Sequence, residues 1–160
     1  MKAFLKGFLY AFRGIIYCIK NERNMRIHTV AALYVLIFAR FFAFTREDYA
    51  LILLTIGGVM SAEAMNTAIE SLADKVSQEK HPLIKAAKDT AAGAVLILAV
   101  ISIGVALFLF GNSEGFEAMY NFYISHPLNL AGVIVLSVLS LLYIIGLPIK
   151  KHKKEVEDDD

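Results

Sequence analysis

Long apolar runs alternate with short polar segments along this chain. The runs predict four membrane-spanning helices, over residues 29–44, 49–72, 91–111 and 128–147. The first run is short, so we expect it to cross a membrane only if the Arg40 side chain reaches the far interface. Between the runs, residues 45–48 predict a tight turn, residues 75–90 a polar connection broken at His81-Pro82, and residues 112–127 a loop.

The first 20 residues show a different pattern from the four runs. Lys2, Lys6, Arg13 and Lys20 fall within roughly 40° of one another on a helical projection, and aromatic and aliphatic residues surround them. Charges spread along the whole segment argue against a first span. Residues 2–20 therefore predict an amphipathic helix on the membrane surface, with its basic edge toward anionic head groups.

Composition places the whole chain in the membrane class. Hydrophobic residues make up 58% of the 160 residues, which is well above the usage of ordinary soluble domains. The prediction is an all-α integral membrane protein with a surface helix and four spans. Sixteen basic residues against 15 acidic ones give a net charge of +1, so we expect no nucleic-acid partner.

Basic residues are distributed unevenly between the two ends of the spans. The surface helix, residues 75–90 and the start of the charged tail (residues 148–160) carry most of them, whereas the other side has only Arg40 and Arg46. Because Lys and Arg in short loops stay in the cytoplasm, both termini and residues 75–90 are predicted to be cytoplasmic. The loop 112–127 is then extracytoplasmic.

A polar stripe interrupts the second run. Glu63, Asn66, Glu70 and Asp74 are spaced i, i+3, i+7 and i+11, which places them on one face of a helix. Counted from Tyr49, Glu63 lies about 21 Å along that helix, just inside the roughly 30 Å hydrocarbon layer. Ionisable groups at this depth need partners, water or a metal, and such positions indicate function.

Further candidate groups share the cytoplasmic face with this stripe. They are Glu22 and the adjacent pair Lys88-Asp89. Carboxylates suit Mg²⁺, a lysine suits a phosphate, and a carboxylate at the interface suits a lipid hydroxyl, which together favour phosphoryl transfer. No P-loop or protein-kinase glycine loop is present. Intramembrane carboxylates also occur in cation or proton pathways, so that alternative stays open at this point, as does a purely structural subunit.

Three sequence motifs carry a resemblance to a known family. ERNMRIH (22–28), EAMNTAIESLAD (63–74) and KHPLIKAAKDTAAGAV (80–95) resemble the prokaryotic-type diacylglycerol kinases, and in detail the undecaprenol kinase branch. The resemblance covers roughly residues 4–110. It implies a homotrimer in the bacterial inner membrane, with active sites between subunits on the cytoplasmic side and with ATP and Mg²⁺ as cofactors.

The resemblance also implies roles for individual residues. Glu63 is similar to the general base, and Glu22 and Glu70 are similar to the carboxylates that hold the magnesium of MgATP. The remaining positions match nucleotide-contacting or site-lining residues: Tyr10, Asn66, Asp74, Glu79, His81, Lys88 and Asp89. From the residues alone, Asp74 and Asp89 would equally pair with nearby lysines, and His81 would equally be a turn residue.

Two departures from the family affect the expected acceptor and architecture. Ala3 stands where the diacylglycerol kinase branch has an arginine, which favours undecaprenol over diacylglycerol as the lipid that is phosphorylated. Members of the family usually end after the third span, whereas this chain adds residues 112–147. The added span contains no charged residue, and we expect it to pack at the periphery of the bundle or to bind a partner.

Overall fold

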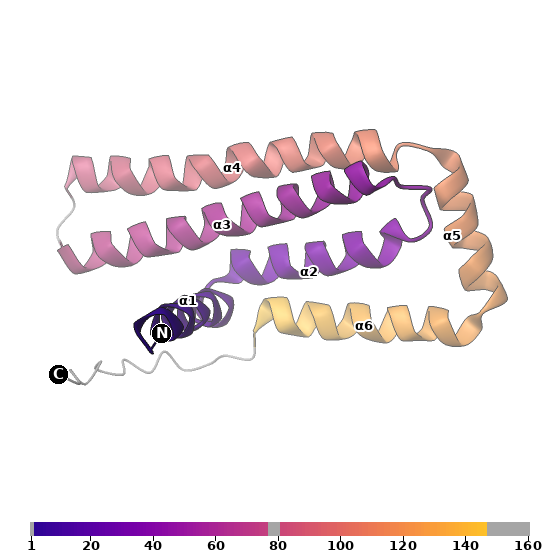
Figure 1. Ribbon diagram of the computed structural model, residues 1–160, viewed down its shortest axis with the longest axis horizontal. Coiled ribbons are helices and arrows are strands. Elements are labelled where there is room, and N and C mark those ends of the chain that lie inside the picture. Colours follow the sequence, from indigo (N-terminus) through magenta and orange to yellow (C-terminus); the bar gives the residue numbers. More distant parts are fainter. Residues whose placement is uncertain (1, 77–80, 147–160) are drawn as a thin grey trace.

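The computed structural model describes residues 2–76 and 81–146, which form six α-helices and no strand (Figure 1). Glu79 and the tail 148–160 lie outside the described residues. The all-α prediction is confirmed. The helices are α1 (Lys2–Asn21), α2 (Arg23–Ala39), α3 (Arg46–Val76), α4 (Pro82–Phe110), α5 (Ser113–Ser125) and α6 (Pro127–Ile145).

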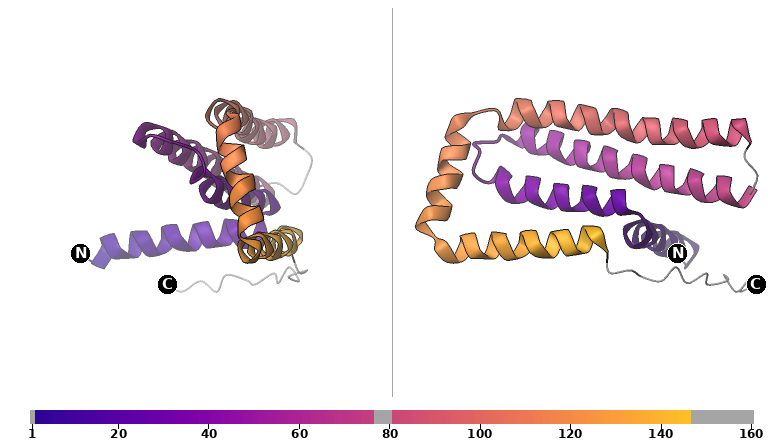
Figure 2. Two further views of the ribbon diagram at one scale, coloured as in Figure 1. Left: turned by 90° about the vertical axis from the view of Figure 1, so that its right-hand side faces the viewer. Right: turned by 180° about the vertical axis from the view of Figure 1, so that it is seen from behind.

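Four of the helices lie side by side in the order α4, α3, α2, α6 (Figure 1). The closest packing is between α3 and α4, while α6 packs on α2. Helix α5 crosses one end of this row, and α1 leaves it sideways near the start of α2 (Figure 2). Helix α6 of the added C-terminal segment therefore lies at the edge of the row, against α2, a neighbour that the sequence does not predict.

Helix α1 keeps the amphipathic character expected of a surface helix. Its aromatic and aliphatic side chains are exposed, with Phe4 70%, Phe8 53% and Phe12 61% accessible. An isolated apolar face of this size is typical of a helix that lies in the membrane interface. The structure thus supports the interfacial interpretation of α1.

Three of the described helices, α3, α4 and α6, are long and apolar enough to cross a membrane. Helix α2 has 17 residues and a length of about 25 Å, short of the roughly 30 Å hydrocarbon layer. It ends at Ala39 rather than at the predicted residue 44, because residues 41–45 turn back toward α3. The crossing of the predicted first span stays a prediction.

Helix α3 begins inside the segment that was predicted as a turn. Thr45 Oγ1 accepts a hydrogen bond from Asp48 N (3.2 Å), and Asp48 Oδ2 accepts one from Thr45 N (2.9 Å). This reciprocal pair is a capping box, which satisfies backbone N–H groups at the start of the helix. The turn is therefore confined to the residues before Arg46.

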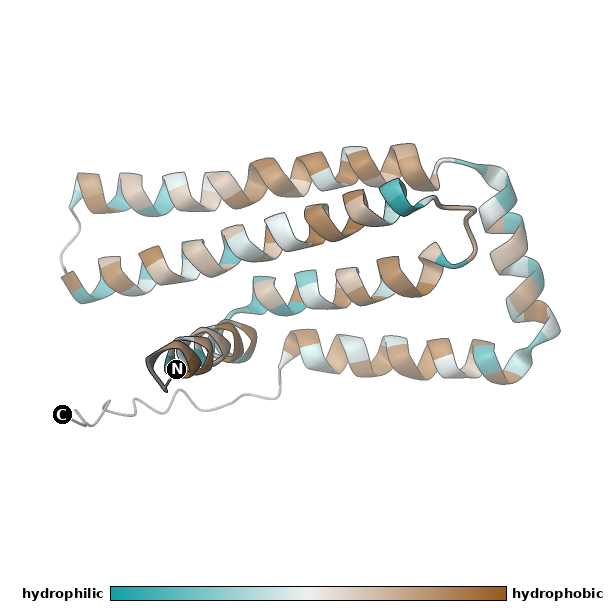
Figure 3. Ribbon diagram, viewed as in Figure 1, coloured by the Kyte–Doolittle hydropathy of each residue, from teal (hydrophilic) through white to brown (hydrophobic). Residues whose placement is uncertain are grey.

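Helices α3 and α4 are much longer than a bilayer is thick. Their 31 and 29 residues correspond to about 46 and 44 Å. Figure 1 shows both helices extending together beyond the ends of α2 and α6. Figure 3 shows hydrophilic residues interspersed with hydrophobic ones along this projecting part, and mainly hydrophobic residues over the rest of α4. The projecting part is suited to contact water-soluble molecules.

Residues 112–127 were predicted as a loop, but the structure places helix α5 there. The Asn112 side chain accepts a hydrogen bond from Gly115 N (2.9 Å), which caps the helix. Phe42 then links α5 to the bundle. Its ring centre lies 5.4 Å from that of Phe116 in α5 and 4.8 Å from that of Phe110 at the end of α4. Glycine is required at position 115, since a Cβ there would lie 2.3 Å from the Phe42 ring.

Polar contacts fix α6 and the end of α5 against α2. The Tyr34 hydroxyl lies 2.8 Å from Ser137 Oγ, and Ser137 Oγ itself donates to Val133 O. Tyr34 is therefore the donor to Ser137. At the far end, Arg40 Nη2 donates to the Tyr123 hydroxyl (3.4 Å) and its guanidinium lies 5.1 Å from the Phe122 ring centre. Arg40 thus reaches α5.

Candidate active site

Glu63 is the centre of the candidate site. It is only 2% exposed, and it is the one charged side chain among the described residues that is fully buried. Its backbone carbonyl accepts a hydrogen bond from Thr67 Oγ1 (3.0 Å). Its Oε2 atom is buried and has no hydrogen-bond partner within residues 2–76 and 81–146. A carboxylate oxygen without a partner is costly to bury, so this atom is available to a hydroxyl group.

Two other carboxylates act on Glu63. Glu22 and Glu70 both repel the Glu63 carboxyl electrostatically, and the Asn24 side chain lies beside it. Glu22 is at the N-cap of α2 but makes no capping hydrogen bond, so its carboxylate is not used to end the helix. Glu22 and Glu70, both predicted site residues, are therefore within electrostatic reach of Glu63.

Asn66 and Glu70 continue the stripe one turn at a time along α3. Asn66 Nδ2 donates to Glu70 Oε1 at 3.1 Å, which fixes the orientation of the amide. Asn66 is 7% exposed, and its Oδ1 atom is buried without a partner in the described part of the chain. The predicted helical face thus carries a second unused acceptor near the first.

Asp74 lies farther along the projecting end of α3 and pairs with α4. Lys88 Nζ donates to Asp74 Oδ1 at 2.6 Å, and the two side chains are 34% and 71% exposed. An ion pair this accessible contributes little to folding. Lys88 is held at the exposed end of the stripe, where its ammonium group is accessible to a phosphate.

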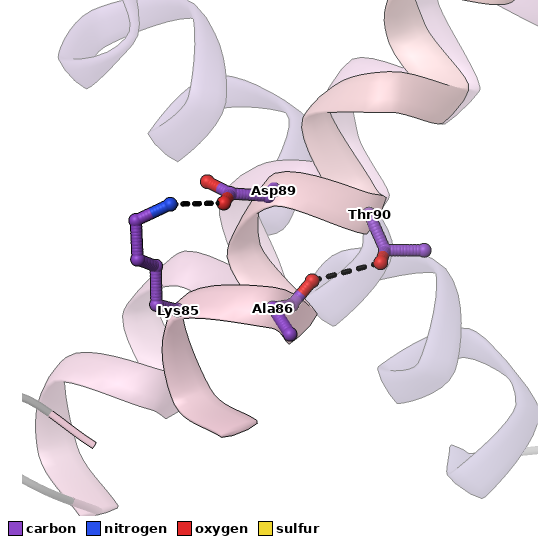
Figure 4. Close-up of polar contacts among 4 residues, drawn as sticks. All are labelled: Lys85, Ala86, Asp89 and Thr90. Atoms are coloured by element: carbon purple, nitrogen blue, oxygen red, sulfur yellow. Dashed lines mark hydrogen bonds and ion pairs between the residues drawn. The ribbon is translucent and has the colours of Figure 1, made fainter. Parts of the chain in front are cut away.

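Asp89 points to a different partner. Lys85 Nζ lies 2.5 Å from Asp89 Oδ2, one helical turn away on α4 (Figure 4). In the same turn, Thr90 Oγ1 donates to Ala86 O at 2.7 Å (Figure 4). The adjacent residues Lys88 and Asp89 therefore belong to two separate ion pairs.

The other predicted nucleotide-contacting residues lie apart from the Glu63 cluster in the described contacts. Tyr10 is exposed on α1, with the Arg13 guanidinium 6.0 Å from its ring centre. His81 is the N-cap of α4, and its Nδ1 accepts from Leu83 N at 3.3 Å. His81 therefore caps α4, and its contact with the nucleotide stays a prediction. Glu79 lies outside the described residues.

The donors present are suited to a shared rather than a fully enclosed metal site. In residues 2–76 and 81–146, no three His, Cys, Asp or Glu side chains are arranged to hold a metal ion. Mg²⁺ commonly takes one or two protein carboxylates and completes its shell with phosphate oxygens and water. Glu22 and Glu70, together with the unpartnered Asn66 Oδ1, fit such a partial set.

The buried carboxylate and the exposed ion pair of the stripe lie far apart along α3. Glu70 lies seven residues from Glu63, about 10 Å along the axis, and Asp74 lies eleven residues away, about 16 Å. The buried carboxylate is at one end and the exposed Asp74–Lys88 pair is at the other. The buried end of the stripe therefore suits a neutral hydroxyl group, and its exposed end suits an anionic group beside Lys88.

Sequence reasoning missed Asn24 and Lys85. Asn24 lies beside Glu63 and is two residues after Glu22 in the motif ERNMRIH, so the motif itself was the available signal. Lys85 precedes Asp89 by four residues, the spacing at which opposite charges on a helix pair. Both signals were present in the sequence.

Comparison with known proteins agrees with the motifs. The family described as prokaryotic diacylglycerol kinase matches residues 9–110. The undecaprenol kinase of Bacillus subtilis is 44% identical over 110 residues, covering 69% of this chain and 89% of that protein. The diacylglycerol kinase of Pseudomonas aeruginosa is 34% identical over 108 residues (67% and 82%). That of Synechocystis is 41% identical over 100 residues (62% and 57%).

The match covers α2, α3 and α4 entirely and most of α1, and it therefore includes the Glu63 cluster and the Asp74–Lys88 pair. Helices α5 and α6 follow the matched region. The chain belongs to the prokaryotic diacylglycerol kinase family of membrane lipid kinases.

Proposed function

We propose that this protein transfers the γ-phosphoryl group of ATP to undecaprenol, giving undecaprenyl phosphate. The observation that carries the proposal is the buried Glu63 carboxylate, with an oxygen that has no partner among the described residues, at the buried end of a polar stripe. Undecaprenol is favoured as the acceptor because the relative with 44% identity is named an undecaprenol kinase. Ala3, where the diacylglycerol kinase branch has an arginine, supports the same choice.

In the proposed reaction Glu63 is the general base. Its carboxylate accepts the proton of the lipid hydroxyl while the hydroxyl oxygen attacks the γ-phosphorus, and ADP leaves. Asn66 holds Glu70 in place through the 3.1 Å hydrogen bond. Lys88, released from or shared with Asp74, neutralises phosphate charge. Glu22 and Glu70 would hold Mg²⁺, which supplies further charge neutralisation on the phosphates when bound.

The proposal includes an assembly and an orientation. We place the protein as a homotrimer in the bacterial inner membrane, with both termini and the active site on the cytoplasmic side. The positive-inside distribution of basic residues supports the orientation, and the family resemblance supports the trimer. In such a trimer Tyr10, Glu79, His81 and Asp89 would contact the nucleotide, some of them in a neighbouring subunit's site.

The test is a phosphorylation assay with the purified wild-type protein and MgATP. Undecaprenol, farnesol, diacylglycerol and ceramide are compared in the same mixed micelles with γ-labelled ATP. The proposal predicts label in the polyprenols, with undecaprenol turned over most efficiently. Preferential label in diacylglycerol would instead favour diacylglycerol as the acceptor. Several relatives are named diacylglycerol kinases.

A different class of function is separated by a flux measurement. A cation or proton pathway through the Glu63 carboxylates would carry ions across sealed vesicles without nucleotide. We expect no such flux above that of empty vesicles. Flux without phosphorylation of any alcohol would overturn the kinase proposal, and the absence of both would leave a structural subunit.

A further inference from the structure

Helix α5 is joined to two apolar helices by very short connections. Two residues separate it from the end of α4 at Phe110, and one residue separates it from the start of α6 at Pro127. Both α4 and α6 are long and apolar enough to cross a membrane. The 19 residues of α6 measure about 28 Å, close to the roughly 30 Å hydrocarbon layer, so an α6 that crosses this layer starts at its edge. The connection to α6 therefore holds the end of α5 at one membrane interface.

The axis of α5 runs across the bundle. The helix leads from α4 to α6 over one end of the row instead of extending any helix of that row (Figures 1 and 2). Because α4 and α6 are the helices that can cross the membrane, a helix laid across their ends runs along the membrane surface. The whole length of α5 therefore lies at the level where α6 begins.

The side of α5 that faces the bundle differs from the opposite side. Gly115 and Tyr123 are buried against the bundle. Glu114, Glu117 and Asn121 are exposed, and they fall within about 60° of one another on the side away from it. In a helix that lies along a membrane surface, such a polar side faces water.

An apolar stripe lies on the flank between these two sides. It consists of Phe116, Tyr120 and Ile124, which are 51%, 64% and 60% exposed and follow one another at intervals of four residues. Leu128, at the start of α6, is 87% exposed and continues the apolar surface that α6 presents to hydrocarbon. Exposed aromatic residues beside a polar face are typical of helices in the membrane interface. Lipid would cover the stripe of α5 as it covers α6.

Arg40 provides a cation at the same end of the molecule. It is exposed, and its guanidinium carbon lies 4.7 Å from the Phe41 ring centre and 5.1 Å from that of Phe122 in α5. Within the described part of the chain its side chain donates one hydrogen bond, to the Tyr123 hydroxyl at 3.4 Å. A guanidinium has several N–H donors and pairs readily with phosphate. Most of the Arg40 donors are therefore available to an anionic oxygen at the level of α5.

We propose that α5 lies in the membrane interface and binds phospholipid there, with its apolar stripe in the upper part of the acyl chains and the Arg40 guanidinium on a head-group phosphate. Phospholipid is the partner that supplies both an alkyl surface for the stripe and an anion for Arg40. The inference rests on α4 and α6 crossing the membrane and not on the proposed kinase reaction. Its failure would therefore leave that reaction untouched, and the reverse also holds.

Tryptophan fluorescence tests the position of the stripe, because the chain contains no tryptophan of its own. Tyr120→Trp is compared with Asn121→Trp, its neighbour on the polar side, in the full-length protein in phospholipid nanodiscs. We expect lipids brominated on the upper acyl chain to quench Tyr120→Trp by about half or more, because an interfacial helix buries its apolar face roughly 5–10 Å into the lipid boundary. Iodide in the water should quench Asn121→Trp instead.

Two results would overturn this placement of α5. Strong iodide quenching of Tyr120→Trp without an effect of brominated lipid would show that the stripe faces water. Quenching by neither agent would show that a second copy of the chain covers the stripe in place of lipid. Both variants change exposed side chains, so we expect the circular dichroism spectrum to match that of the wild type.

Native mass spectrometry tests the phosphate contact. Arg40→Gln and Arg46→Gln are each released from nanodiscs, and the phospholipid that stays bound to each protomer is counted. Arg46 is an exposed arginine at the start of α3, and it serves as the matched control. We expect Arg40→Gln to retain less phospholipid than wild type and Arg46→Gln to retain as much. Equal retention in all three proteins would contradict a phosphate contact by Arg40. The fluorescence measurement keeps Arg40 and does not depend on the folding of these variants.

Discussion

Burial sets Glu63 apart from the other carboxylates of the chain. The Glu63 carboxylate is 2% exposed and is repelled by two further carboxylates. Its burial therefore does not stabilise the folded state. By contrast, Glu70 accepts a hydrogen bond from Asn66 on its own helix, and Asp74 accepts one from Lys88 on α4. The position of Glu63 is therefore explained by chemistry rather than by stability.

Substitution of Glu63 by Gln should separate catalysis from binding. The amide keeps the shape of the side chain but cannot accept the hydroxyl proton, so we expect kcat to fall by about 10²–10⁴-fold. ATP binding, measured by equilibrium dialysis, should change less than twofold. Glu114→Gln, at the opposite end of the molecule, serves as the control and should leave kcat unchanged. Wild-type turnover in Glu63→Gln would show that Glu63 is not the base.

The two lysines at the start of α4 provide a matched pair. Lys88 is held beside Asp74 on α3, whereas Lys85 pairs with Asp89 on its own helix. Because exposed ion pairs contribute at most about 1 kcal/mol, neither Lys→Ala change should alter the melting temperature much. We expect Lys88→Ala to raise the KM for ATP about tenfold or more, and Lys85→Ala to raise it much less. Equal effects of both substitutions would argue against a specific phosphate contact by Lys88.

Helical spacing made part of this site predictable. The spacing of Glu63, Asn66 and Glu70 implied a common face, and the Asn66–Glu70 hydrogen bond agrees with it. Adjacent residues on a helix point about 100° apart, so Lys88 and Asp89 could not both face α3. The contact between Lys88 and Asp74 depends on the register of α3 against α4, and no periodicity within one helix contains that information.

At the scale of elements, α5 shows how a short polar segment becomes ordered. Residues 112–127 contain too many polar groups for a span and were predicted as a loop. The Asn112 cap and the Phe42 contacts stabilise a helix that the local sequence pattern does not predict, because most helical stability in proteins comes from tertiary packing. Phe42 is distant in sequence from α5, so this contact was not visible in the local sequence.

Gly115 is the most constrained position of this element. A Cβ would meet the Phe42 ring at 2.3 Å, so Gly115→Ala should force α5 away from the bundle and cost about 1–3 kcal/mol of stability. Unfolding by heat in detergent micelles, followed by circular dichroism, measures the loss. Gly132→Ala is the control in α6, where a Cβ meets nothing within 4 Å, and it should be neutral or slightly stabilising. Equal melting temperatures for the two variants would contradict this packing.

At the scale of the whole molecule, the unequal helix lengths make the two ends of the bundle different. Helices α3 and α4 project together at one end, and α5 crosses the other end (Figure 1). The apolar runs and their order were readable from the sequence. The neighbour of α6 was not, because its side chains carry no charge and its apolar face fits any hydrophobic surface equally well.

The two ends should be on opposite sides of the membrane. In a Cys18→Ser background, which removes the only native cysteine, we expect Lys85→Cys to react with a membrane-impermeant maleimide only in inverted vesicles. Glu114→Cys should react only in right-side-out cells or vesicles. Both positions are exposed in the structure. Reaction of both cysteines from the same side would contradict the proposed orientation.

The contact of α6 with α2 has a consequence for how copies of this chain would associate. Tyr34 and Ser137 close one flank of α2 within each protomer, so that flank is not available to a neighbouring subunit. Relatives that end after the equivalent of α4 would leave the same flank uncovered. Helices α5 and α6 would therefore limit which proteins can assemble with this one. A mixed oligomer with such relatives would have to form through surfaces that α6 does not cover.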